Sequence, residues 1–340
     1  MIKLHSAMAR GECVGLYERW CDATKEKDKR KRYWTYVEKD GGRDEIREDL
    51  AETIRSHYDR LERIAFNAFP ATFKPDMWAH QYDQQANQVV CKVSEDRIYT
   101  TNGPDANLFG LEPNYGCCTA NMHQGWPKFA THLWMRTPDD GLAAVAYAPC
   151  ELSATLGGAE VKVRVETDYP FRDAVAITVE TNTPVQFPLW LRIPGWAKSA
   201  EVRVGDGGTQ HAESGTFHTI AREWNGTTAV ALRLPMQVQL ERRYNESIAI
   251  ERGPLIYSLK IGEYWKYLRG EEPHADWEVF PTTPWNYALA VNAGDPASSI
   301  TFEERPVGNL PFSPEGAPLL STTVTVKLHT AGVLPGARSS

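Results

Sequence analysis

The 340-residue sequence contains no hydrophobic run of the roughly 18 residues that a membrane-spanning helix requires. Met1–Arg10 has no apolar segment of the signal-peptide type. The net charge is −7, without the excess of positive charge that nucleic-acid-binding proteins concentrate on one face. Six cysteines are too few for a disulfide-stabilised scaffold in a chain of this length. We therefore expect neither a membrane nor a nucleic acid as partner, while cellular location and oligomeric state stay open.

The composition is that of a globular protein with a sizeable core. Hydrophobic residues make up 42% of the sequence, and its length suits about two domains. One basic run, Lys25–Arg32, has acidic residues interleaved and is predicted to be a solvated loop or linker. Eleven tryptophans and fourteen tyrosines are many, and such rings serve either stacking on sugars or packing in a core.

The first part of the chain has helical periodicity. Asp44–Ala68 carries apolar residues at spacings of three, four and seven, which predicts a helix that ends before a proline. A second helix is predicted from Thr119 or Asn121 to Trp134, with either a kink or a late helix start at Pro127. The predicted fold class is therefore mixed α and β, because the pattern changes further on.

Thr137–Gly141 is the clearest boundary, since the hydrophobic period beyond it changes to two. Short strands separated by turns such as Asn225–Gly226 predict a β-sandwich. Glu263–Ala297 has no clear pattern and is predicted to be irregular. The predicted strands are Leu142–Tyr147, Val161–Glu166, Val175–Glu180, Leu189–Ile193, Val202–Val204, Ala229–Leu234, Val238–Arg242, Ile248–Glu251, Leu255–Ile261 and Val324–Leu328.

The chemistry of the chain centres on two adjacent cysteines, Cys117 and Cys118. Neighbouring cysteines rarely form a disulfide with each other, because the required geometry is reached only with strain. Two thiolates side by side suit zinc, and a zinc-bound thiol is deprotonated. The pair therefore predicts a metal site, a nucleophile, or both. The alternative is that both are small buried residues at a helix start.

Three segments carry a resemblance to a known family. GLEPNYGCCTAN (residues 110–121) resembles the cysteine-pair motif of the β-L-arabinofuranosidase family of glycoside hydrolases, family 127. DRLERIAFNA (residues 59–68) and WAHQYDQQ (residues 78–85) resemble segments upstream of that motif. Members of the family are longer, with an α/α barrel in their first half. The resemblance thus implies that this chain begins near the end of that barrel.

The predicted organisation follows from the pattern and the resemblance together. Residues 1–136 are expected to be the remnant of the α/α barrel and to carry the cysteine pair. Residues 137–262 are expected to form the β-sandwich. Residues 263–340 are expected to be an irregular and β-rich region, part of a second sandwich.

The resemblance implies a zinc-dependent nucleophile. In the family the first cysteine of the pair attacks the sugar and both bind zinc, which makes Cys117 the nucleophile and Cys118 a ligand. The family's other two ligands come from a Glu-x-Cys motif, for which this chain offers Glu12 and Cys13 without the intervening residue. Cys21 is a second choice for the third thiolate. Cys91 is a fallback, and Cys150 is predicted to be structural.

The remaining candidates surround the substrate. The family's general acid corresponds to a position before Met1, and Glu112 is the carboxylate nearest the pair in sequence. Glu112 is either a proton donor or metal ligand, or a residue that stabilises its turn. The resemblance places the segment around Trp78, His80 and Tyr82 at the substrate. The list of substrate-binding candidates is Trp78, His80, Tyr82 and His123, where each histidine is alternatively a ligand or a hydrogen-bonded structural residue.

Four functional hypotheses result. The first is retaining hydrolysis of non-reducing-end β-L-arabinofuranosides, or of a related sugar, with a carbohydrate as the partner and zinc as the cofactor. The second is a non-catalytic fragment with a structural zinc. The third is a carbohydrate-binding β-sandwich protein. The last is a cysteine acyl hydrolase, which needs a histidine base such as His123.

Overall fold

The computed structural model describes residues 57–74, 76–96, 99–100, 102–111, 116–243, 247–308, 311–312, 320–324 and 326–328. The chain divides into two compact units. The first contains the described residues up to Glu62 and Pro127–Met236. The second contains Arg63–Trp126 and the described residues from Gln237 onward. The predicted regions 1–136, 137–262 and 263–340 are consecutive stretches of sequence, whereas each compact unit combines two separate stretches. The predicted regions stay a prediction.

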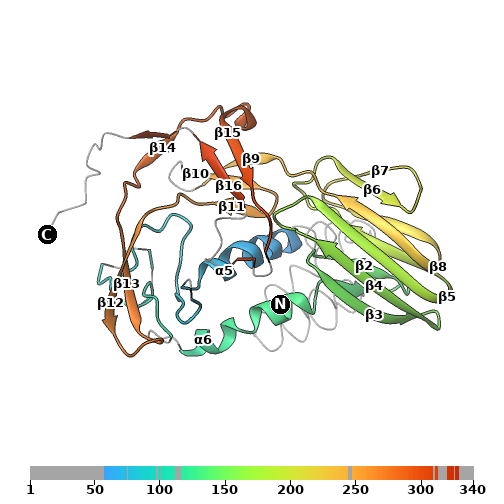
Figure 1. Cartoon of the computed structure of the whole chain (residues 1–340), viewed down its shortest axis with the longest axis horizontal. Coiled ribbons are helices and arrows are strands. Elements are labelled where there is room, and N and C mark those ends of the chain that lie inside the picture. The colour runs from blue at the N-terminus through green and yellow to red at the C-terminus, as the bar shows by residue number, and fades with distance from the viewer. Residues whose placement is uncertain are drawn as a thin grey trace, which may run out of the picture. The chain divides into compact units, whose positions relative to one another are not determined.

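The first unit is built on one eight-stranded sheet (Figure 1). Its two longest strands, β5 (Ala174–Arg192) and β8 (Phe217–Arg233), pair antiparallel along their length. On the other edge of β5, β4 (Ala159–Thr167) pairs with the first half and β2 (Leu142–Ala144) with the second half. The other strands are β1 (Trp134–Arg136), β3 (Cys150–Leu156), β6 (Ala200–Val204) and β7 (Gln210–Ala212).

The alternation predicted for these strands is confirmed in β4. Val161, Val163 and Val165 are buried, while the residues between them are exposed, so one face of the strand points into the core. Trp224 of β8 is also fully buried, and its indole nitrogen donates to the backbone oxygen of Phe187 at 2.9 Å. Hydrophobic residues at every second position therefore build the core of this unit.

The predicted turn at Asn225–Gly226 is wrong, because these residues lie within β8. The two separate strands predicted over Val175–Glu180 and Leu189–Ile193 are likewise one continuous strand, β5. The pairing of β5 with β8 shifts register between Thr181 and Val185, opposite Gly226, which has a φ of 64°. Glycine accepts this left-handed conformation at no steric cost, so it produces an irregularity within a strand instead of a hairpin.

The helix predicted to reach Trp134 is also wrong in its extent. Two short helices, α6 (Gly116–Met122) and α7 (Gly125–Ala130), take its place, and β1 begins at Trp134. Pro127 lies in the first turn of α7, where its missing N–H has no helical partner to lose.

A buried ion pair stabilises the first unit. Glu62 and Arg192 have relative exposures of 0% and 1%, and Arg192 Nη2 lies 2.5 Å from Glu62 Oε2. Glu62 also accepts from the Tyr169 hydroxyl at 2.6 Å and from the Tyr147 backbone N–H at 3.1 Å. Asp59 forms a second ion pair with Arg192. Burial alone would lower the pKa of Arg192, but the two carboxylates hold it above its usual value. The residues before Glu62 are thereby attached to the sheet.

In the second unit, a helical segment packs on a three-stranded sheet. The segment comprises η1 (Ile64–Ala68), a π-helical turn, and α5 (Phe69–Ala71), so the helix predicted to end at Ala68 continues for three residues. The sheet has the order β11–β10–β9. Its strands are β9 (Val238–Arg242), β10 (Ile248–Arg252) and β11 (Leu255–Tyr257).

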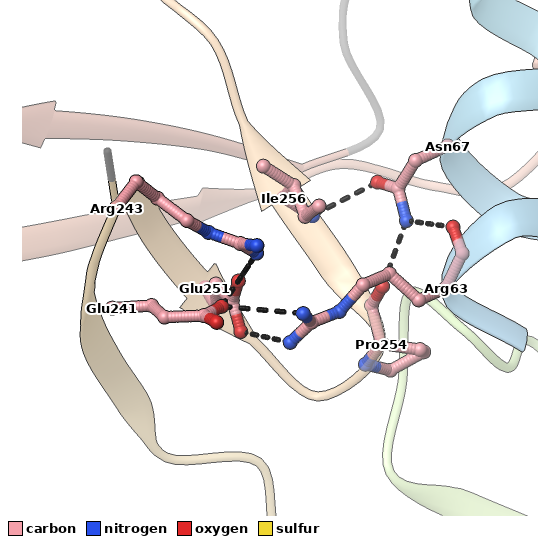
Figure 2. A network of polar contacts seen from close by, with 7 residues as sticks. All are labelled: Arg63, Asn67, Glu241, Arg243, Glu251, Pro254 and Ile256. Atoms are coloured by element: carbon pink, nitrogen blue, oxygen red, sulfur yellow. Dashed lines mark hydrogen bonds and ion pairs between the residues drawn. The ribbon is translucent and has the colours of Figure 1, made fainter. Parts of the chain in front are cut away.

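Two polar side chains join the helical segment to this sheet (Figure 2). The Asn67 amide nitrogen donates to the backbone oxygen of Pro254 at 2.8 Å, and its oxygen accepts from the backbone N–H of Ile256 at 2.8 Å. Arg63 forms ion pairs with Glu241, at 3.2 Å, and with Glu251. These contacts satisfy backbone groups and charges that the packing would otherwise leave without partners.

The two carboxylates lie on one face of the sheet with a second cation, Arg243, beside them. Arg243 Nη2 is 2.6 Å from Glu241 and 3.1 Å from Glu251 (Figure 2). Burial, followed by the hydrogen bond with Glu241, raises the pKa of Glu251 to about 7, although Arg63 opposes the shift. The same hydrogen bond holds the pKa of Glu241 below its ordinary value. The pair thus shares one proton near neutral pH.

The region Glu263–Ala297, predicted to be irregular, contains a β-hairpin. Its strands β12 (Glu263–Arg269) and β13 (Asp276–Pro281) pair antiparallel. Two more pairs follow, β14 (Tyr287–Leu289) with β17 (Val326–Leu328) and β15 (Ile300–Glu304) with β16 (Leu320–Val324), with η3 (Pro296–Ser299) before β15. The predicted last strand, Val324–Leu328, therefore corresponds to β17 and the end of β16.

The mixed α and β fold class is confirmed, and sheet predominates among the described residues. The α/α barrel expected for residues 1–136 stays a prediction. Within the part of the chain that the structure describes, no helix is both long and apolar enough to cross a membrane.

Candidate active site around the cysteine pair

Cys117 and Cys118 occupy the first turn of α6, in the second unit. Their sulfur atoms lie 3.6 Å apart, and both thiols are free of disulfides. Two sulfur ligands of a tetrahedral zinc ion, each with a Zn–S bond of about 2.3 Å, are about 3.8 Å apart. The observed separation therefore fits two ligands of one ion.

The two cysteines have different surroundings. Cys117 is exposed, whereas Cys118 is half-buried and hydrogen-bonds to the Tyr82 hydroxyl. Burial and then the neighbouring Cys117 raise the pKa of the Cys118 thiol, which the Tyr82 hydrogen bond only partly offsets. The charge of Cys118 in turn raises the pKa of Tyr82. These surroundings therefore favour the protonated thiol of Cys118, whereas a bound cation would favour its thiolate.

His80 connects the segment around Trp78 to helix α6. Its Nε2 lies 3.0 Å from the Thr119 hydroxyl oxygen, and that hydroxyl donates to the backbone oxygen of Leu111 at 2.7 Å. The other ring nitrogen, Nδ1, lies 3.3 Å from the backbone oxygen of Gln81. The backbone of His80 also pairs with Gly110 in both directions, at 2.9 and 3.1 Å. His80 thus holds the loop and the helix together. This contact is consistent with the alternative that His80 is a hydrogen-bonded structural residue.

The other predicted substrate-binding residues lie at the surface. Trp78 is 50% exposed, and His123 is exposed with its Nδ1 3.4 Å from the backbone oxygen of Thr119. Of the sequence-predicted residues, the structure brings together Cys117, Cys118, His80 and Tyr82, and their roles stay predictions.

The third and fourth metal ligands are not found among the described residues. Within that part of the chain, no group of three or more histidine, cysteine, aspartate or glutamate side chains is arranged to hold a metal ion. Cys91, the fallback ligand, instead accepts a hydrogen bond from the Gln81 amide at 3.2 Å, and burial raises its pKa to about 12. Cys150 lies on β3 in the first unit, where burial raises its pKa. A raised pKa disfavours the thiolate form, which is the nucleophile and the metal ligand.

Several predicted residues fall outside the described residues. These are the carboxylate Glu112 and the candidate ligands Glu12, Cys13 and Cys21. Their predicted roles are unchanged by the structure.

Sequence reasoning assigned no role in the site to Thr119, which it named only as a helix start, or to Asp83. Thr119 contacts His80, and Asp83 accepts from Asn102 at 2.8 Å and from Thr100 beside the Tyr82–Cys118 contact. The charge of Asp83 contributes to the raised pKa of both Tyr82 and Cys118. Thr119 directly follows Cys118 and Asp83 directly follows Tyr82, and this adjacency could have marked them as part of the site.

The match to a family model lies within the first unit. Residues 141–236 match the profile of a family described as β-L-arabinofuranosidase, GH127 middle domain. The resemblance to glycoside hydrolase family 127 is confirmed. The matched residues include strands β2 to β8, and the cysteine pair lies outside them. No protein in the search of curated proteins matches the chain.

Several solved structures of glycoside hydrolases resemble this chain. A GH127 β-L-arabinofuranosidase from Geobacillus stearothermophilus T6 is 17% identical, covering 66% of this chain and 43% of its own, with a TM-score of 0.44. A protein described as a glycoside hydrolase is 18% identical, covering 67% and 46%, with a TM-score of 0.50. A GH127 β-arabinofuranosidase is 16% identical, covering 68% and 43%, with a TM-score of 0.47. The chain spans less than half the length of these proteins, and at such identities the likeness concerns the fold alone.

Proposed function

We propose that this chain is part of a retaining glycosidase that hydrolyses non-reducing-end β-L-arabinofuranosides, or a closely related sugar, with Cys117 as the nucleophile. The observation that carries the proposal is the cysteine pair at the start of α6, with its sulfur atoms 3.6 Å apart. The family match over residues 141–236 supports the reaction class. We also propose that residues 1–136 belong to an α/α barrel, as the resemblance implies.

The unequal surroundings of the two cysteines support a division of labour. Cys117 is exposed, so its sulfur can approach the anomeric carbon of a sugar. Cys118 is half-buried and bonded to Tyr82, so it is suited to remain a fixed ligand. Cys117, Cys118, Cys13 and Glu12 would hold the zinc. Zinc, when bound, supplies the charge that keeps a thiol deprotonated at neutral pH.

The chemistry of this chain then follows the retaining pattern. The Cys117 thiolate attacks the anomeric carbon while the glycosidic oxygen leaves with a proton from a carboxylic acid. Water then attacks the anomeric carbon from the face that the leaving group vacated, opposite the cysteine, and displaces the Cys117 thiolate while the carboxylate just formed takes the proton of the water. Glu112 is the candidate for this acid within the chain, and a carboxylate from the rest of the barrel is the alternative.

Zinc content and turnover test the proposal together. We expect about one zinc per chain, because the proposed site holds a single ion. This zinc should be lost in both Cys117→Ala and Cys118→Ala. Cys150→Ala, on β3, is the matched control and should retain the metal. Turnover of an aryl β-L-arabinofuranoside should be absent in Cys117→Ala. Turnover that persists in this variant would exclude Cys117 as the nucleophile.

A second candidate is a non-catalytic, carbohydrate-binding fragment with a structural zinc. The observation that favours it is the Trp78 ring, which is 50% exposed and offers a face on which a sugar can stack. Stoichiometric zinc with no turnover in the unmodified chain would support this candidate over the first.

A further inference from the structure

A tight turn presents Trp78 to solvent. The backbone N–H of Lys74 donates to Ala79 at 2.8 Å, and that of Met77 donates to Lys74 at 2.8 Å. Asp76 accepts from the backbone N–H of Trp78 at 3.0 Å, and the Trp78 side chain is left 50% exposed. A large apolar ring is thus kept out of the core by a closed, hydrogen-bonded turn.

This turn is strained and held in place from both sides. Met77 has a φ of 62°, a left-handed conformation that costs energy in any residue other than glycine. Lys74 binds Asp76 at 2.7 Å, and its ammonium lies 4.6 Å above the ring of Trp277. Ala79, at the end of the turn, is 1% exposed. Strain of this kind persists only where the surrounding structure enforces it, and it often accompanies a binding role.

A second exposed ring lies against Trp78. His274, from the turn of the β12–β13 hairpin, has its ring centroid 5.1 Å from that of Trp78 at an angle of 69°. The hairpin is anchored, because the Trp277 backbone pairs with Phe109 at 2.7 and 3.2 Å and that of Val279 with Cys91 at 2.7 and 2.9 Å. The edge-on contact holds the indole in one orientation while leaving half of its surface open.

We propose that Trp78 and His274 form a carbohydrate platform that stacks against the second sugar of the substrate; this rests on the proposed function. Sugar rings have C–H faces that pack on an indole, and hydroxyls at their edges that hydrogen-bond to polar groups. The exposed His274 ring and Asp76 carboxylate provide such groups beside Trp78. A rigid aromatic anchor binds with little loss of side-chain entropy.

The position of the platform in the chain fits a site next to the cysteines. Trp78 lies four positions before Tyr82, which contacts Cys118. The two Cα atoms are therefore at most about 14 Å apart. This limit places the platform within the reach of an oligosaccharide whose terminal sugar lies at Cys117.

The test compares a disaccharide with a monosaccharide. The full unmodified chain, with its zinc, is titrated by NMR with a thio-linked β-L-arabinofuranosyl disaccharide and with methyl 1-thio-β-L-arabinofuranoside, both of which resist hydrolysis. We expect Trp78→Ala to weaken disaccharide binding by about tenfold and to leave monosaccharide binding unchanged. Trp78→Phe should recover part of the loss, and His274→Ala should have a smaller effect. Trp285→Ala, which removes another tryptophan of the second unit that is 49% exposed, should have none.

Three results would overturn the platform. These are unchanged disaccharide binding in Trp78→Ala, an equal loss for both sugars, and no disaccharide binding by the parent chain. Turnover by the unmodified chain is measured separately. Turnover with unchanged binding in Trp78→Ala would refute the platform alone, and binding that depends on Trp78 without turnover would refute the proposed function alone.

Discussion

Replacing Glu62 with glutamine should destabilise the first unit strongly, although the side chain keeps its size. Glu62 has 0% exposure and accepts from three donors, the Arg192 guanidinium, the Tyr169 hydroxyl and the Tyr147 backbone N–H. A glutamine keeps one acceptor oxygen and places an NH2 group where these donors converge. The substitution therefore removes a charge and also sets donor against donor.

The expected loss follows from the cost of breaking a buried ion pair. Removing one partner of such a pair costs about 3–5 kcal/mol, because the other charge is left without compensation. Asp59 remains as a partner of Arg192, so the lower part of this range is expected. A loss of about 3 kcal/mol lowers the melting temperature of a unit of this size by about 10 °C.

Thermal unfolding followed by near-ultraviolet circular dichroism measures the effect. Glu166→Gln, which makes the same chemical change at an exposed position of β4, is the matched control and should melt within about 2 °C of the unmodified chain. If Glu62→Gln also melts like this control, the inferred role of the buried pair is refuted.

Three further substitutions probe other contacts. Asn67→Ala should lose about 2–3 kcal/mol in urea unfolding, because two hydrogen bonds to the β10–β11 region are removed and a backbone N–H is left without its acceptor; exposed Asn87→Ala should lose almost nothing. Gly141→Ala should lose about 1–3 kcal/mol, because its Cβ would lie 2.3 Å from a backbone oxygen, whereas Gly208→Ala meets no atom within 4 Å. The pKa of Glu251, raised to about 7, means that the folded state holds a proton that the unfolded state releases above its ordinary pKa. This stabilisation is complete at low pH and is lost as pH rises through 7, so urea unfolding should show a decrease of about 1 kcal/mol from pH 6 to pH 8 that Glu251→Gln removes.

Each of these predictions has an outcome that contradicts it. Equal midpoints for Asn67→Ala and Asn87→Ala would mean that the amide contacts contribute nothing. Equal midpoints for the two glycine variants would mean that the backbone relaxes around the added methyl group. A stability that is flat or rises between pH 6 and 8 would exclude the shared proton on Glu251.

The fold was predictable where local pattern and long-range packing agree. The alternation of Val161, Val163 and Val165 predicted β4, because one face of that strand is buried along its whole length. The hairpin from Glu263 to Pro281 was missed because β12 pairs only with β13, and most of its residues are exposed on both faces. A ribbon of this kind has no hydrophobic period to detect.

The continuity of β5 was missed for a different reason. Pro184 and Pro188 interrupt the strand pattern, and proline normally marks a strand end or an irregularity. Here β5 keeps its pairing with β8 by shifting register between Thr181 and Val185. Such a shift depends on the partner strand, so it cannot be derived from the β5 sequence alone.

The candidate site was predictable in its residues but not in their contacts. The cysteine pair is contiguous in sequence, so its sulfur separation follows from local geometry. The contact between His80 and Thr119, by contrast, depends on the backbone pairing of His80 with Gly110. No local pattern encodes that pairing, because the two segments lie thirty residues apart.

The difference between the two cysteines is the step that only the structure supplies. In sequence, Cys117 and Cys118 are equivalent neighbours, and the resemblance alone assigned the nucleophile to the first. In the structure, burial and the Tyr82 hydrogen bond restrict Cys118, while Cys117 is exposed. Under the proposed function, this difference suits Cys118 to the role of a fixed ligand and leaves Cys117 accessible to a sugar. Removing the Tyr82 hydroxyl should therefore disturb Cys118 before it disturbs Cys117.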